Sequence, residues 1–153
     1  MSLRLIVLIC GVLALASCTR PGINIPEITD KTPEEVARVL GAADSMYTQK
    51  IVTKAIYTER YRREFEIEIM YLNGLSTDIV VLDAAPELPF EPSAIATFGF
   101  KAIPPTDVMK NAYIKWKNYP GYKTINCFAT DLDGAGEVEK FQIFFKSDGI
   151  PNN

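Results

Sequence analysis

The sequence predicts an α+β fold: an antiparallel sheet with short helices packed on one side, built as two tandem halves of one helix and three strands. Segments of alternating apolar and polar residues recur along the chain, which is the pattern of strands with one buried face. A helix-start pattern precedes each group of three such segments, near Thr32 and again near Pro92. The length of 153 residues and the hydrophobic content of 48% fit one globular body.

The first segment, residues 1–17, has the features of an export signal. Arg4 supplies a positive charge, and residues 5–17 form an apolar stretch that ends in small residues. This stretch is 13 residues long, whereas a helix that spans a membrane needs about 20. We therefore expect a signal peptide that is removed from the mature protein.

Residues 15–18 read Leu-Ala-Ser-Cys and resemble the lipobox of bacterial lipoproteins. The resemblance implies that Cys18 carries a diacylglyceryl group on its thiol and that cleavage follows Ser17. Two or three acyl chains on one residue would anchor the protein stably, because each buried methylene contributes about 0.8 kcal/mol. The alternative is that Cys18 merely ends the signal and that a soluble product is released.

A lipidated tether is predicted for residues 18–31, followed by a helix. The tether contains two prolines and a glycine and shows no periodicity, as linkers do. Thr32 is then a good N-cap, and Glu35 completes a capping box with it. Gly41 is expected to end this helix.

Three strands are expected in the remainder of the first half, which spans residues 32–83. Residues 54–61 and 64–71 alternate in polarity, and residues 75–82 run back after an Asn-Gly turn. Glu64, Glu66 and Glu68 are predicted to lie on the solvated face of the sheet, with Lys or Arg opposite them.

The second half repeats this order more loosely over residues 92–146. A proline-rich linker, residues 84–91, separates the halves. A helical segment is expected from Pro92 to Gly99, then strands at residues 111–117, 122–130 and 138–146, and a C-terminal tail at residues 147–153. Residues 131–136 have part of the spacing of a calcium loop, but Ala135 supplies no oxygen ligand and Gln142 stands where a bidentate Glu is needed. They predict a hairpin turn instead.

Composition argues against several functions. The chain contains no histidine, which removes the commonest general base and the Ser-His-Asp and Cys-His catalytic arrangements. Its net charge of −3 argues against a nucleic-acid partner. After removal of Cys10 with the signal, Cys127 would be the only thiol besides Cys18, and it is expected to pack as a small hydrophobic residue. We therefore expect no enzyme activity, no cofactor and no metal site.

A lipobox, a short tether, a helix ending in Leu40-Gly41 and a strand hairpin resemble the small envelope lipoproteins of the SmpA/OmlA type. The resemblance covers residues 32–146 in outline and implies a fold like that of β-lactamase inhibitor proteins. It also implies a binding or assembly module, and it transfers no catalytic residue.

The leading functional hypothesis is a noncatalytic lipoprotein of the cell envelope that binds another envelope protein. Aromatic and basic residues are common anchors of interfaces, and here the candidates are Tyr57, Arg60, Tyr61, Arg62, Trp116, Tyr119 and Tyr122. For Trp116, burial in the sheet is the favoured interpretation. The membrane would be a partner through Cys18, and Thr19, which is not the Asp of inner-membrane retention, favours an outer membrane if the envelope is Gram-negative.

Two alternatives remain at this point. One is a carrier of a small or lipid-like ligand in the periplasm, with a cavity between sheet and helices. Its lining candidates are Phe65, Ile67, Phe141, Ile143 and Phe145. The other is a carboxylate-based hydrolase that uses the three outward glutamates.

Overall fold

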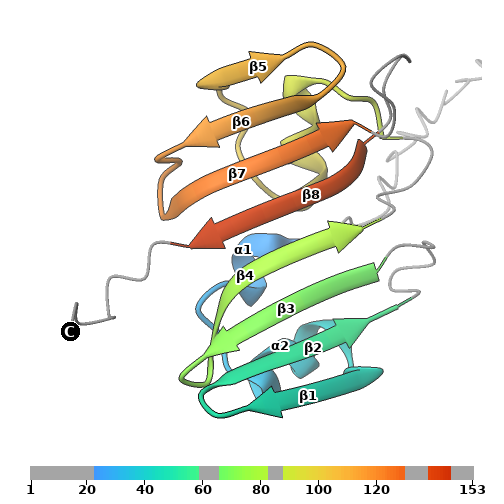
Figure 1. The fold of residues 1–153 in the computed structure, drawn as a ribbon, viewed down its shortest axis with the longest axis vertical. Helices are drawn as coiled ribbons and strands as arrows, with labels where there is room; N and C mark the ends of the chain where they lie inside the picture. The colour runs from blue at the N-terminus through green and yellow to red at the C-terminus, as the bar shows by residue number, and fades with distance from the viewer. Residues whose placement is uncertain (1–22, 59–65, 83–87, 130–137, 146–153) are drawn as a thin grey trace, which may run out of the picture.

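The computed structural model describes residues 23–58, 66–82, 88–129 and 138–145. Eight strands of these residues form one antiparallel sheet in the order β1-β2-β3-β4-β8-β7-β6-β5 (Figure 1). This order is symmetric. The last strands of the two halves, β4 and β8, pair at the centre, and the first strands, β1 and β5, form the two edges.

Each half contributes four consecutive strands and at least one short helical segment. The strands of the first half are β1 (Ser45–Gln49), β2 (Val52–Tyr57), β3 (Glu66–Leu72) and β4 (Leu75–Leu82). Those of the second half are β5 (Asp107–Met109), β6 (Tyr113–Lys117), β7 (Tyr122–Ala129) and β8 (Val138–Phe145). The helical segments are α1 (Ile25–Ile28), α2 (Pro33–Leu40) and the 3₁₀ segment η2 (Pro92–Phe98). In the described part of the chain, no helix has the length and apolar character needed to cross a membrane.

The predicted α+β class is wrong, because the molecule is mainly an eight-stranded antiparallel sheet. The described helical segments are only 4, 8 and 7 residues long, so they cover part of the sheet without forming a helical layer comparable to it. The prediction of three strands in each half is also wrong, because β1 and β5 were not foreseen. All five residues of β1 are exposed, and a strand without a buried face shows no alternation.

The core lies on the side of the sheet that carries the helical segments, which we call the inner face. Alternate residues of the strands point to it, as in the buried pairs Ile69–Ile79 and Val81–Phe141. The ring of Phe98 in η2 stacks on Phe141 with 4.2 Å between centroids. The inner face is thus closed by direct contacts between sheet and helical segments.

Residues from Ile23 onward belong to this core. Ile23, Ile25 and Ile28 are all buried, although they fall within the lipidated tether predicted for residues 18–31. Glycine is required where this segment passes η2: a Cβ on Gly99, whose φ is +83°, would lie 2.3 Å from Oδ1 of Asn24. The tether prediction therefore fails for residues 23–31.

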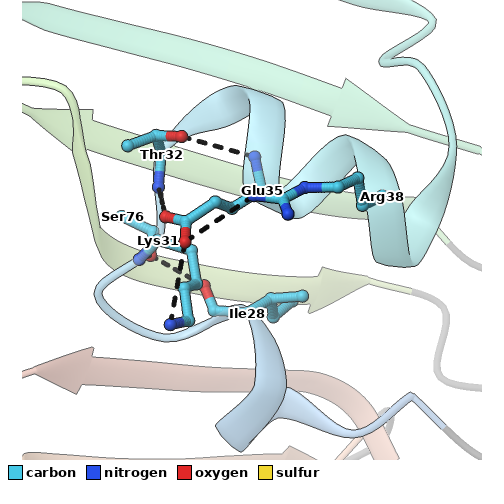
Figure 2. A network of polar contacts seen from close by, with 6 residues as sticks. All are labelled: Ile28, Lys31, Thr32, Glu35, Arg38 and Ser76. Carbon is cyan, nitrogen blue, oxygen red and sulfur yellow. Dashed lines mark hydrogen bonds and ion pairs between the residues drawn. The ribbon is translucent and has the colours of Figure 1, made fainter.

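The capping box at the start of α2 is confirmed. The Glu35 amide donates to Oγ1 of Thr32 at 3.3 Å, and the Thr32 amide donates to Oε2 of Glu35 at 3.0 Å (Figure 2). Gly41 caps the other end with φ +84°. Local sequence therefore defines both ends of this helix.

Ser76, at the start of β4, ties the loop between α1 and α2 to the sheet (Figure 2). Its hydroxyl is fully buried; it donates to the Ile28 carbonyl at 2.7 Å and accepts from the Lys31 amide at 3.1 Å. The Ser76 amide donates to the Lys31 carbonyl at 3.0 Å. One side chain thus satisfies two backbone groups that no regular element pairs.

Replacing Ser76 with Ala should lower the free energy of unfolding by about 1–3 kcal/mol, because two backbone groups lose their partner in a buried position. Urea denaturation followed by circular dichroism measures this change. Ser93→Ala, at an exposed site on η2, serves as the matched control and should change stability by less than about 0.5 kcal/mol. Equal effects of the two substitutions would contradict the role given to Ser76.

Candidate functional site

The face of the sheet opposite the helical segments is the outer face (Figure 1). On this outer face, strand register places apolar side chains next to one another. They lie at the end of the first half where the β1–β2 and β3–β4 turns are found. Val52 pairs with Leu72, and Leu72 with Leu75. We call this cluster the outer patch, and its residues are Tyr47, Ile51, Val52, Met70, Leu72 and Leu75.

The outer patch is unusually exposed for its apolar character. Tyr47, Ile51 and Leu75 keep 68%, 60% and 44% of their surface accessible. Two of these residues adjoin hairpin turns: Ile51 lies in the turn after β1, and Leu75 follows Asn73-Gly74. Hairpin turns usually carry polar residues because they are surrounded by water. A cluster of exposed apolar residues at such turns therefore indicates a contact surface.

The outer patch is hollowed beside β1. The depression has a volume of ≈ 490 Å³. Its lining residues are Tyr47, Gln49, Lys50, Ile51, Val52, Lys54 and Met70. The lining therefore combines apolar surface with two cationic side chains and contains no carboxylate.

The two outward glutamates that the structure describes, Glu66 and Glu68, have different surroundings. Glu68 forms an ion pair with Lys54 on the neighbouring strand, which agrees with the prediction of a basic residue opposite the glutamates. Glu66 is half-buried at the start of β3, and Glu64 lies outside the described residues. The ion pair engages one oxygen of the Glu68 carboxylate.

The centre of the outer face carries polar groups that are short of partners. Oδ1 of Asp78 and Oδ1 of Asn126 are buried, and neither has a hydrogen-bond partner among the described residues. Burial raises the pKa of Asp78 to about 6, although the charge of Lys140 and a hydrogen bond with Gln142 act in the opposite direction. Glu68 adds a smaller upward contribution. This carboxylate is thus held in an environment that disfavours its charge.

Three of the predicted interface tyrosines lie in the core. Tyr57 is fully buried, and its hydroxyl hydrogen-bonds to that of Tyr71 at 3.3 Å. The hydroxyl of Tyr119 donates to the Lys101 carbonyl at 3.0 Å, and that of Tyr122 lies 3.0 Å from Oγ1 of Thr29. These tyrosines bury their rings and satisfy their hydroxyls internally. The prediction that they form an exposed partner-binding surface is therefore corrected.

The other predicted site residues fall into two groups. Trp116 is buried, as favoured, and its indole donates to the Ile103 carbonyl at 3.0 Å. Cys127 is also buried, and burial raises the pKa of its thiol to about 12, so it packs as a hydrophobic residue. Four candidates lie outside the described residues: Cys18, Arg60, Tyr61 and Arg62.

The outer patch itself was missed by sequence reasoning. Its residues come from four strands and one turn, so only strand register brings them together. A signal did exist: the segment 45–49 contains neither charge nor proline, and Ile51 occupies a turn where a polar residue is usual.

Comparison with known proteins identifies no family. No model of a known protein family matches the sequence, and no curated protein matches it either. Among solved structures, a cysteine-rich secretory protein from Staphylococcus aureus is similar, with 11% sequence identity and a TM-score of 0.46. The match covers 84% of this chain and 48% of that one, so this chain spans about half the length of its neighbour. A likeness this distant carries no argument about function.

The raised pKa of Asp78 predicts a pH-dependent stability. The folded-state pKa of about 6 exceeds the ordinary value of 3.8, so the folded protein holds more protons than the unfolded chain between these values. Stability from this group is therefore fully present below about pH 4 and is lost as the pH rises through 6. Asp78→Asn should raise the free energy of unfolding at pH 7 by about 1–2 kcal/mol, after allowance for partial exposure.

The measurement is urea denaturation of both proteins at intervals from pH 4 to pH 8. The difference between variant and wild type should grow from pH 4 to about pH 6 and then level off. A constant difference would show that the carboxylate is not destabilised by folding.

Proposed function

We propose that this protein is a lipid-anchored, noncatalytic module of the bacterial cell envelope that binds another envelope protein through the outer patch. The observation that supports the proposal is the exposure of Tyr47, Ile51 and Leu75 on a sheet face that no described helical segment covers. A tyrosine beside a depression is a typical anchor point of an interface.

The depression beside β1 suggests the chemistry of the partner. An apolar side chain of the partner would fill the hollow between Tyr47, Ile51 and Met70. Lys50 and Lys54 at the same hollow would favour an acidic residue next to that side chain. Lys54 is already paired with Glu68, so Lys50 is the cation that offers new charge.

The carrier alternative receives less support. Ile67, Phe141 and Ile143, three of its predicted lining residues, are fully buried within the protein's own core. Phe98 and Phe100 both pack against Phe141. Side chains in such contact fill the interior instead of lining a space. Phe65 lies outside the described residues, as does the side chain of Phe145.

Membrane attachment through Cys18 is the second part of the proposal. Cys18→Ala in the full chain should abolish incorporation of labelled palmitate and release the protein from the membrane fraction, because the thiol that accepts the lipid is gone. Cys127→Ala is the matched control, and it should leave both properties unchanged. Continued labelling of the Cys18→Ala protein would overturn the anchor.

Partner binding is tested by photocrosslinking in intact cells. A photoreactive amino acid at Leu75 or Met70 should give an adduct with one and the same envelope protein, because both positions lie in the outer patch. The control position is Ala96, which is exposed on η2. The adduct from Met70 should fall at least about tenfold when Leu75→Asp places a charge in the interface. Adducts that are equally frequent from Ala96 would contradict the proposal.

A further inference from the structure

β1 is an edge strand without the features that normally protect edges. Among the described strands it pairs only with β2, and all five of its residues are exposed. Natural edge strands usually carry a charge, a proline or a bulge that prevents pairing with another chain. The segment Ser45–Gln49 contains neither a charged residue nor a proline. At the opposite edge, β5 is only three residues long.

The turn between β1 and β2 determines which backbone groups face the open edge. Gln49 pairs with Val52 across the two-residue turn of Lys50 and Ile51, and Lys50 has a φ of +55°. In such a hairpin the flanking residues direct their backbone groups at each other, and the direction alternates along the strand. The backbone groups of Met46 and Thr48 are therefore left on the open side, one residue before and one after Tyr47.

The charges that flank β1 are complementary under a two-fold rotation. Asp44 precedes the strand and Lys50 follows it, and both residues are exposed. In an antiparallel pair of two β1 strands centred on Tyr47, Asp44 of each copy lies opposite Lys50 of the other. The Asp44 carboxylate also accepts hydrogen bonds from Thr58, which holds it at the end of the strand. A parallel pairing would instead place like charges together.

From this arrangement we propose that two copies of the protein associate by antiparallel pairing of their β1 edges about a two-fold axis at Tyr47, which joins the two sheets into one. Met46 of each copy then pairs with Thr48 of the other. The two Tyr47 rings meet at the axis, in a position where cross-strand side chains approach most closely. The interface is isologous, as in most dimers, and it covers the exposed surfaces of Met46 and Tyr47.

A second copy fits this edge better than an unrelated strand does. A negative charge (Asp44) precedes the uncharged strand and a positive charge (Lys50) follows it. When two such strands run antiparallel, each negative charge therefore faces a positive charge. An unrelated strand would need to supply the same order by chance. The association uses the edge of the sheet, whereas the proposed partner site uses its outer face; Tyr47 and Lys50 are the residues that the two share.

The test measures the mass of the full chain in detergent by size-exclusion chromatography with light scattering. Wild type should be a dimer at micromolar concentration. Tyr47→Lys and Tyr47→Asp should each be monomeric, because two like charges meet at the axis. An equimolar mixture of these two variants should form the dimer again. Since Tyr47 is exposed, circular dichroism should show that both variants remain folded.

The matched control is Val108→Lys on the β5 edge, where the side chain is 54% exposed; this protein should remain a dimer. A monomeric wild type, a dimeric Tyr47→Lys protein, or a mixture that stays monomeric would overturn the proposal. Leu75→Asp should weaken partner crosslinking and leave the dimer intact, so the failure of one proposal is distinguishable from the failure of the other.

Discussion

The pairing of β4 with β8 is the interaction on which the rest of the architecture depends. It is the only pairing between the two halves of the described sheet, and it places Ile79 beside Ile143 and Val81 beside Phe141 on the buried inner face. All other described pairings join strands that are neighbours in the sequence. Because the last strands of both halves are used at the centre, the first strands are left at the edges. The exposure of β1 thus follows from how the halves are joined.

Much of the sheet could be predicted from local pattern, because burial of one face leaves a period of two in the sequence. The bounds expected for β4, residues 75–82, agree with the structure, and those for β3 and β7 differ by at most two residues. The capping box also identified α2. The predicted fold class was wrong for two reasons. Two strands were missed, because β1 lacks a buried face and β5 is short. The helix content was overestimated, because the helix-start signals lead into only short helical segments.

The candidate site was much harder to predict than the strands. Aromatic type alone does not distinguish an anchor of an interface from a core residue, and Tyr57 and Tyr122 are core residues whose hydroxyls bond internally. The outer patch depends on register, since Val52, Leu72 and Leu75 become neighbours only when two hairpins are in place. Ser76 was missed for a related reason: its partners Ile28 and Lys31 are more than forty residues away. The sequence pattern shows which residues share one face of a strand, whereas a surface site on the sheet depends on how the strands pair.

The burial of Ile23 has a consequence for how the molecule would stand on a bilayer. Five peptide steps separate it from Cys18, and an extended chain of five residues reaches at most about 17 Å. With acyl chains on Cys18, so short a tether would keep the folded part of the protein within one protein diameter of the lipid headgroups. Ile23 is buried and lies two residues before α1, which covers the inner face of the sheet (Figure 1). The outer face would then point away from the bilayer, towards other components of the envelope.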